Sequence, residues 1–130
     1  MKNGKGVRDM LFLEYPPCST CKKAKRWLDD HGLLYEDRNI KTEPPTKEEL
    51  SSWYRASGLP LKRFFNTSGV RYQALGLKDR LPTMTEDKQL TLLASDGMLV
   101  KRPLLIDGGR VLVGFKEPQW ADLNTTKTEL

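Results

Sequence analysis

The sequence has few of the residues on which several classes of protein depend. Among its 130 residues there are two cysteines and one histidine, too few for a disulfide framework. No apolar run approaches the roughly 20 residues that a membrane-spanning helix requires. The opening MKNGKGVRDM contains no apolar stretch that would serve as a signal peptide. The sequence therefore predicts a cytoplasmic protein whose cysteines are reduced, catalytic, redox-sensing or metal-binding.

The surplus of positive charge has two interpretations. Twenty-two Lys and Arg against 17 Asp and Glu give a net charge of +5, which invites a nucleic-acid interpretation. Apart from CKKAKR and VKRP, however, the basic residues are interleaved with acidic ones along the chain. This spacing is typical of a solvated surface, so we expect no direct contact with nucleic acid and none with a membrane. A pocket for a small oxyanion is the other use of such charge.

The chain predicts one domain with short polar ends. Residues 1–9 are polar and without periodicity, which is typical of a disordered leader. Residues 10–123 predict a single domain, since 38% of the chain is hydrophobic and its length is that of one compact core. Residues 124–130 predict a polar tail.

The first part of the domain has the pattern of a strand, a helix and a second strand. The apolar run MLFLEY predicts a buried strand, and LYEDRNI predicts another. Between them, Ser19 or Thr20 is expected to cap a helix that Gly32 ends. The two strands of such a unit are expected to be parallel, with a right-handed crossover.

The second part predicts several helices and then a hairpin. PPTKEELSSWYRASG has a capping box from Thr46 to Glu49 and a stop at Gly58. Further helical segments, the hairpin and a last short helix are predicted in LKRFFNT, GVRYQALGL, PTMTEDKQLTLLASDG (capping box Thr83 and Glu86), RPLLIDGGRVLVGF and EPQWADL. The order βαβ, helices, ββα predicts an α/β protein with a small mixed sheet, the thioredoxin-like fold with a helical insertion.

Cys18 and Cys21 are the candidate reactive pair. Cys18 falls where the first strand ends and the first helix begins, so free backbone N–H groups and the helix dipole favour its thiolate. Lys22 is four residues further along the same helical face and is expected to add positive charge. Cys18 is therefore the predicted nucleophile. Cys21, one turn into the helix, is the predicted resolving thiol.

Two other interpretations of the pair stay open. One CxxC supplies two of the four ligands of a structural zinc site, and His31 lies ten residues away on the apolar face of the helix. A zinc site would need ligands from a second chain, so we expect no metal. The cysteines could also be small apolar fillers at a helix start.

Arg102 and Pro103 are the second candidate segment. In thioredoxin-like folds a cis-proline before the third strand faces the cysteine loop, and the order of elements puts Pro103 there. A cis bond is physically permissible because X–Pro is the one peptide in which cis costs little. Arg102 would then face the loop, where its guanidinium would bind an oxyanion or a thiolate. The alternative is an ordinary surface arginine.

Several segments in the same order resemble the arsenate reductase (ArsC) family. They are CSTCKKAKRWLDDHG, RNIKTEPPTKEEL, LGLKD, LLASDGMLVKRPLL and VLVGF. The resemblance spans about residues 10–123 and is strongest to the CxxC-bearing branch with Spx- and MgsR-type regulators. It implies a thioredoxin-like fold and thiol chemistry, with an external reductant (thioredoxin, glutaredoxin or glutathione) and no bound cofactor. Ser19, Thr20 and Pro103, around the cysteine loop, are expected to contribute to binding.

The family divides into enzymes and regulators. In glutaredoxin-linked arsenate reductases, the resemblance matches Cys18 to the nucleophile and Arg102 to the arginine before the proline. Glu14 and Lys22 stand where a histidine and an arginine occur, and Asn66 and Gly114 where two further arginines occur. Spx-type members bind the RNA polymerase α subunit and use the cysteine pair as a redox switch. The sequence thus favours a thiol–disulfide oxidoreductase of unknown substrate, with a redox-switched regulator and an arsenate reductase as alternatives.

Overall fold

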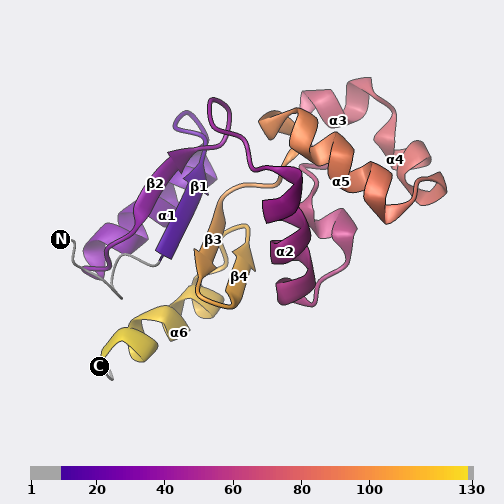
Figure 1. The fold of residues 1–130 in the computed structure, drawn as a ribbon. Coiled ribbons are helices and arrows are strands. Elements are labelled where there is room, and N and C mark those ends of the chain that lie inside the picture. Colours follow the sequence, from indigo (N-terminus) through magenta and orange to yellow (C-terminus); the bar gives the residue numbers. More distant parts are fainter. Residues whose placement is uncertain (1–9, 129–130) are drawn as a thin grey trace. The chain divides into compact units, whose positions relative to one another are not determined.

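The computed structural model describes residues 10–128, and the side chains of residues 10–123. The chain forms two compact units (Figure 1). One contains the described residues up to Arg38 and from Arg102 onward; the other is Asn39–Lys101. The two cysteines, Arg102 and Pro103 all belong to the first unit.

The first unit is a four-stranded mixed sheet with two helices. The strand order is β2-β1-β3-β4, which confirms the predicted α/β, thioredoxin-like fold. The elements are β1 (Met10–Glu14), α1 (Ser19–Asp30), β2 (Glu36–Asn39), β3 (Leu104–Asp107), β4 (Arg110–Val113) and α6 (Glu117–Thr128). Strand β3 is antiparallel to both of its neighbours, and Phe12 of β1 is paired with Leu105. Gly108, at φ 60°, forms the β3–β4 turn that the sequence predicts.

An aromatic cluster forms the core of this unit. Trp120 of α6 is fully buried, and its ring makes edge contacts with Phe12, Trp27 and Phe115 at centroid distances of 6.3, 6.0 and 4.9 Å. Such edge contacts are a favoured geometry for aromatic pairs. The cluster joins the middle of β1, the second half of α1 and α6, and so fixes α1 against the sheet.

Helix α6 is longer than the sequence predicts. EPQWADL accounts for its first seven residues, but the helix continues to Thr128, into the range predicted as a polar tail. The leader predicted for residues 1–9 lies outside the described residues. Within residues 10–128, no helix is long and apolar enough to cross a bilayer.

The second unit is mainly helical. Its elements are α2 (Lys47–Ser57), η2 (Leu61–Phe64), α3 (Val70–Ala74), α4 (Leu77–Arg80), η3 (Leu81–Thr83), α5 (Glu86–Ser95) and η4 (Gly97–Leu99). The predicted capping box of Thr46 and Glu49 is present, and Gly58 ends α2 at φ 70°. The predicted cap of α5 is wrong. Thr85 caps it, through the N–H of Lys88, because Thr83 still belongs to the preceding turn.

Gly97 is required by a close backbone contact in the second unit. A Cβ at this position would lie 1.9 Å from the carbonyl oxygen of Ile40, and backbone cannot move aside as a flexible side chain can. We expect Gly97→Ala to lower the free energy of unfolding by about 1–3 kcal/mol, the usual cost of overpacking. Chemical denaturation measures this. Gly109→Ala is the control, since its Cβ would meet nothing within 4 Å; equal losses in both variants would contradict the account.

Candidate functional site

The two cysteines lie at the amino end of α1 in unequal environments. Cys18 is partly exposed and Cys21 is fully buried, and both are free thiols. The backbone N–H of Cys21 donates to Cys18 Sγ at 3.3 Å, and the N–H of Tyr15 donates to Cys21 Sγ at 3.5 Å. One thiol is therefore accessible to a substrate while the other is held just behind it.

Cys18 itself caps the helix. The sequence predicts Ser19 or Thr20 as the cap, and this is wrong: both are exposed residues of the first helical turn. The N–H of Cys18 donates to Tyr15 O at 2.9 Å across the two prolines, which holds Cys18 in an extended conformation suited to an N-cap. Its sulfur thus takes the place of the usual cap oxygen, at the positive end of the helix dipole.

The pKa values of the two thiols are shifted in opposite directions from that of a free cysteine. Partial burial opposes ionisation of Cys18, but hydrogen bonds from the side chain and backbone of Cys21, with the charge and a hydrogen bond of Arg102, lower its pKa. Burial raises the pKa of Cys21 to about 12; the Tyr15 N–H opposes this, and the Cys18 sulfur adds to it. The geometry thus favours a thiolate at Cys18 and a thiol at Cys21, as a nucleophile and a resolving cysteine require.

Arg102 reaches the cysteine loop from the segment before β3. Its guanidinium carbon lies 5.0 Å from the centre of the Tyr15 ring, within the range of a cation–π contact. The peptide bond from Arg102 to Pro103 is cis, as the thioredoxin-like fold implies. Pro103 is buried, and its carbonyl oxygen accepts the N–H of Gly114 at 2.8 Å. Tyr15 therefore contacts both residues that lower the pKa of Cys18: its N–H donates to Cys21 Sγ, and its ring lies against Arg102. The sequence pattern did not indicate this role.

Lys22, which the sequence predicts to add positive charge beside Cys18, lies on the exposed surface of α1. Its side chain is exposed and lines a surface groove of about 460 Å³ with Lys23, Lys25, Arg26 and Asp29. The cation among the main causes of the low Cys18 pKa is Arg102. A contribution of Lys22 to the thiolate stays a prediction.

We expect Arg102→Gln to raise the pKa of Cys18, because it removes both a positive charge and a hydrogen-bond donor from the thiolate. The rate of Cys18 alkylation against pH measures this pKa. Arg26→Gln, the same change at an exposed position of α1, is the control and should leave the profile unchanged. Lys22→Gln tests the sequence prediction in the same assay. If Arg102→Gln gave the wild-type profile, the assigned role of Arg102 would be wrong.

A buried carboxyl group lies directly before the cysteine loop. Glu14, the last residue of β1, is 6% exposed, and a protonated Glu14 shares a hydrogen bond with Asp37 of β2. Burial, this hydrogen bond and the charge of Asp37 raise the pKa of Glu14 to about 7. Burial works against ionisation of Asp37 too, but Glu14 and Lys25 lower its pKa. Below about pH 7 the pair therefore holds one proton, on Glu14.

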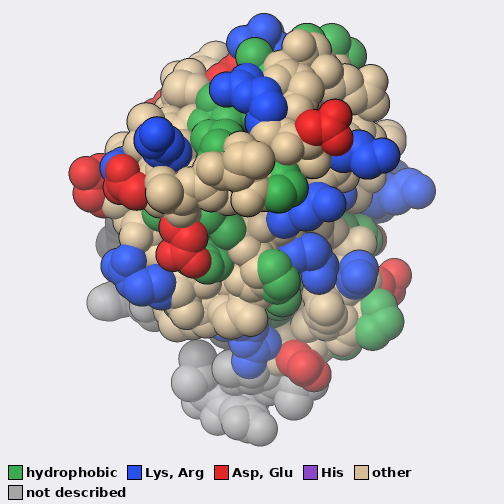
Figure 2. All heavy atoms as spheres, turned by 90° about the vertical axis from the view of Figure 1, so that its right-hand side faces the viewer, with side chains coloured by type: hydrophobic (Ala, Val, Ile, Leu, Met, Phe, Trp, Pro, Cys, Tyr) green, Lys and Arg blue, Asp and Glu red, His purple; other side chains and the backbone are tan. Residues whose placement is uncertain are grey.

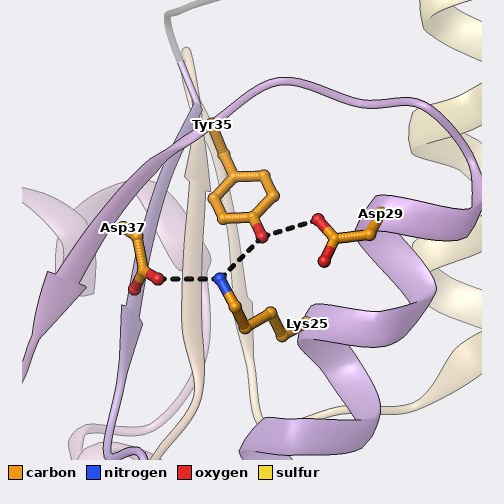
Figure 3. Close-up of polar contacts among 4 residues, drawn as sticks. All are labelled: Lys25, Asp29, Tyr35 and Asp37. Carbon is orange, nitrogen blue, oxygen red and sulfur yellow. Dashed lines mark hydrogen bonds and ion pairs between the residues drawn. The ribbon is translucent and has the colours of Figure 1, made fainter.

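Lys25 connects this pair to α1 (Figure 3). Its ammonium group lies between Asp37 and Tyr35, donating to Asp37 Oδ2 at 2.9 Å and to the Tyr35 hydroxyl at 3.1 Å. The Tyr35 hydroxyl donates in turn to Asp29 Oδ1 at 2.8 Å. This chain of contacts ties α1 to β2 and to the carboxyl pair. The sequence offers one indication of this carboxyl pair, namely that the acidic Glu14 ends the otherwise apolar strand β1.

Side chains that bind metals, namely His, Cys, Asp and Glu, do not gather in groups of three or more suited to a metal among the residues that the structure describes. The single histidine, His31, stacks on Trp27 with 3.9 Å between ring centroids, and its Nδ1 lies 2.8 Å from Trp27 O.

Comparison with known proteins assigns the family. The ArsC family model matches residues 13–123, so the chain belongs to the ArsC family. The "Uncharacterized protein YusI" of Bacillus subtilis (strain 168) is 56% identical over 87% of this chain and 96% of its own. The regulatory protein MgsR of the same organism is 28% identical (93% and 94%), and the global transcriptional regulator Spx of Listeria innocua 30% identical (80% and 78%).

Solved structures agree with this assignment. A crystal structure of an ArsC family related protein from Bacteroides fragilis is 54% identical, with a TM-score of 0.88 over 90% of this chain and 98% of the other. A protein from Streptococcus mutans UA159 described as a possible arsenate reductase is 47% identical, with a TM-score of 0.83 and the same coverage. The chain thus has ArsC-like and Spx-type relatives, together with a CxxC pair.

Proposed function

We propose that the protein is a cytoplasmic thiol–disulfide oxidoreductase in which Cys18 is the nucleophile and Cys21 the resolving thiol. The observation that carries the proposal is the asymmetry of the pair: an accessible Cys18 sulfur that accepts hydrogen bonds, and a fully buried Cys21 behind it. An inert structural pair would not need a low pKa on the exposed member.

The first step is attack of the Cys18 thiolate on one sulfur of a substrate disulfide. A bond forms between Cys18 and that sulfur, the substrate S–S bond breaks, and the second substrate sulfur leaves with the electron pair. The leaving thiolate takes a proton from solvent. The product is a mixed disulfide in which the Cys18 sulfur is uncharged.

The second step is attack by Cys21 on the mixed disulfide. Two of the causes that keep Cys21 protonated, its hydrogen bond to the Cys18 sulfur and the charge of that sulfur, are lost once Cys18 is uncharged. The Cys21 proton passes to the departing substrate thiolate as the Cys18–Cys21 bond forms. Overall, two cysteines are oxidised to a disulfide and one substrate disulfide is reduced to two thiols. An external dithiol, thioredoxin or glutaredoxin, or two glutathione molecules, would restore the pair.

Turnover tests this proposal. The protein is assayed with a glutathionylated peptide as substrate and with three reducing systems in turn: thioredoxin with thioredoxin reductase, glutathione with glutathione reductase, and glutaredoxin together with glutathione and glutathione reductase, each supplied with NADPH. We expect NADPH oxidation above the protein-free rate with at least one reductant. No turnover with any of them would contradict a role as an oxidoreductase.

A redox-switched regulator is the second candidate, favoured by the relatives named Spx and MgsR. In that role the same Cys18–Cys21 disulfide would alter affinity for the carboxyl-terminal domain of the RNA polymerase α subunit. Pull-down with that domain, using the dithiol and disulfide forms, should give unequal capture. No capture in either state would exclude this candidate.

Arsenate reduction is the third candidate, favoured by the solved relative described as a possible arsenate reductase. Arg102 beside Cys18 is suited to an oxyanion. Gly114, however, stands where the reductases have an arginine and adopts φ 77°, a conformation that an arginine side chain disfavours. Arsenite release in the presence of glutaredoxin and glutathione would support this candidate, and its absence would exclude it.

A further inference from the structure

The second unit contains a basic cavity that the cysteine chemistry does not use. It measures about 400 Å³, within the size range of small-molecule sites. It is lined by Pro60, Lys62, Arg63, Phe65, Thr67 and Lys101. Three of these six side chains are cationic, and among the described residues no acidic side chain lines the cavity.

The cavity is built from two chain segments that the backbone joins. Phe65 and Val100 form an antiparallel bridge. The N–H of Asn66 donates to Leu99 O, and that of Lys101 to Phe64 O, both at 2.8 Å. These bonds bring Lys101 beside a lysine and an arginine that precede it by almost forty residues. Because the bonds involve backbone, the convergence of the cations does not depend on contacts between their own side chains.

The turn that carries Thr67 is also fixed. The N–H of Gly69 donates to Asn66 O at 3.0 Å, and a Cβ on Gly69 would lie 2.5 Å from the side-chain nitrogen of Asn66. The asparagine side chain therefore folds over a glycine that leaves room for it. This closed turn holds Thr67 at the wall of the cavity.

The charges at the cavity are not compensated within the described part of the chain. Lys62, Arg63 and Lys101 form no ion pair with a described residue, whereas other cations of the unit do: Lys47 pairs with Asp87, and Arg71 with Asp96. Lys62 and Arg63 are exposed and Lys101 is half-buried. Figure 2 shows Lys and Arg side chains spread over one face of the molecule with hydrophobic side chains among them. The groove beside α1 is also lined by cations, but it includes the acidic Asp29, whereas the three cations of this cavity converge with no acidic side chain in the described part of its lining.

We propose that this cavity binds the phosphate group of a small phosphorylated molecule. A phosphate monoester carries a charge between −1.5 and −2 at neutral pH and presents three peripheral oxygens, so it balances three cations better than a single carboxylate does. The planar fork of Arg63 matches two of those oxygens, and the lysines and Thr67 donate to the others. The volume exceeds that of a free phosphate ion, and Pro60 and Phe65 provide an apolar wall for the organic part. The site lies wholly within Asn39–Lys101, whereas the cysteines belong to the first unit. The phosphate proposal can therefore be tested independently of the cysteine chemistry.

Titration of the ¹⁵N-labelled full chain with phenyl phosphate tests the proposal. At constant ionic strength, we expect saturable shifts of the amide signals of Phe65, Thr67 and Lys101. Benzoate, an aromatic carboxylate, and inorganic phosphate, which lacks the organic part, serve as comparison ligands. Both should bind more weakly than phenyl phosphate. Equal shifts with benzoate, or no saturable shift at these amides, would overturn the proposal.

Variants identify the residues responsible. We expect Arg63→Gln with Lys101→Gln to weaken phenyl phosphate binding at least about tenfold, since two charge-assisted contacts are lost. Arg63→Lys keeps the charge but not the fork, and should fall between this variant and the wild type. Lys78→Gln, at an exposed position of the same unit, should bind as the wild type does. An equal loss in the Lys78 variant would show general charge attraction and overturn the site. Dispersed spectra of each variant confirm folding.

Discussion

Replacing Cys18 with serine is expected to abolish thiol–disulfide exchange, and replacing Cys21 with serine is expected to stop it halfway. Without Cys18 the partly exposed sulfur is lost, and the remaining thiol of Cys21 is fully buried, with burial still raising its pKa. Without Cys21 the first attack still occurs, but nothing within the protein resolves the mixed disulfide. Mass spectrometry after exposure to oxidised glutathione distinguishes the two outcomes.

The two variants serve as controls for each other, since each removes one sulfur from the same helix. Cys21→Ser should accumulate one glutathione per chain on Cys18, and Cys18→Ser should remain unmodified. The reverse pattern, or equal modification of both variants, would contradict the assignment of roles. Unchanged exchange in Cys18→Ser would remove the basis of the proposed function.

Replacing Glu14 with glutamine is expected to stabilise the protein above neutral pH. The pKa of Glu14 is raised to about 7 in the folded chain, whereas in an unfolded chain it is near 4.5. Between these values the folded protein retains a proton that the unfolded chain releases, so the free energy of unfolding falls as pH rises. The full penalty, present above pH 7, is roughly 3 kcal/mol. Glutamine keeps a donor toward Asp37 without this ionisation.

Denaturant unfolding of the variant and the wild type at a series of pH values measures the difference. The two should be similar near pH 4.5 and diverge toward pH 8, with the variant more stable. Asp37, Lys25 and Asp29, which influence Glu14, are present in both proteins, so their own titration cancels to first order. Glu36→Gln, at an exposed position of β2, is the control. Parallel pH profiles for Glu14→Gln and the wild type would contradict a buried, protonated Glu14.

The elements of the fold were predictable where local chemistry alone decides them. The capping box at Thr46, the stop at Gly58 and the turn at Gly108 each depend on residues adjacent in sequence, and all three are confirmed. The caps of α1 and α5 were predicted wrongly, because neighbouring Ser and Thr residues offer equivalent caps. In α1, the turn through Pro16 and Pro17 places Cys18 at the cap. In α5, Thr83 belongs to the preceding turn η3, so Thr85 is the cap.

The candidate site was predictable in part for the same reason. The position of Cys18 and Cys21 at a helix start follows from spacing and flanking residues. Tyr15, which contacts both Cys21 and Arg102, was not indicated, since one of its contacts uses the backbone N–H that every residue except proline has. Likewise the link from Glu14 to Asp37 and Lys25 depends on which strands lie side by side. Sequence spacing alone does not specify these neighbours.

The account depends most on a reversible disulfide between Cys18 and Cys21. A redox titration of the purified chain in glutathione buffers, with trapped thiols counted by mass spectrometry, measures it directly. We expect a single two-electron transition to an intramolecular disulfide, at a midpoint of roughly −200 to −300 mV, within the range of known dithiol proteins. A chain that forms no intramolecular disulfide at any glutathione potential would contradict the account and leave the pair with a structural or metal-binding role.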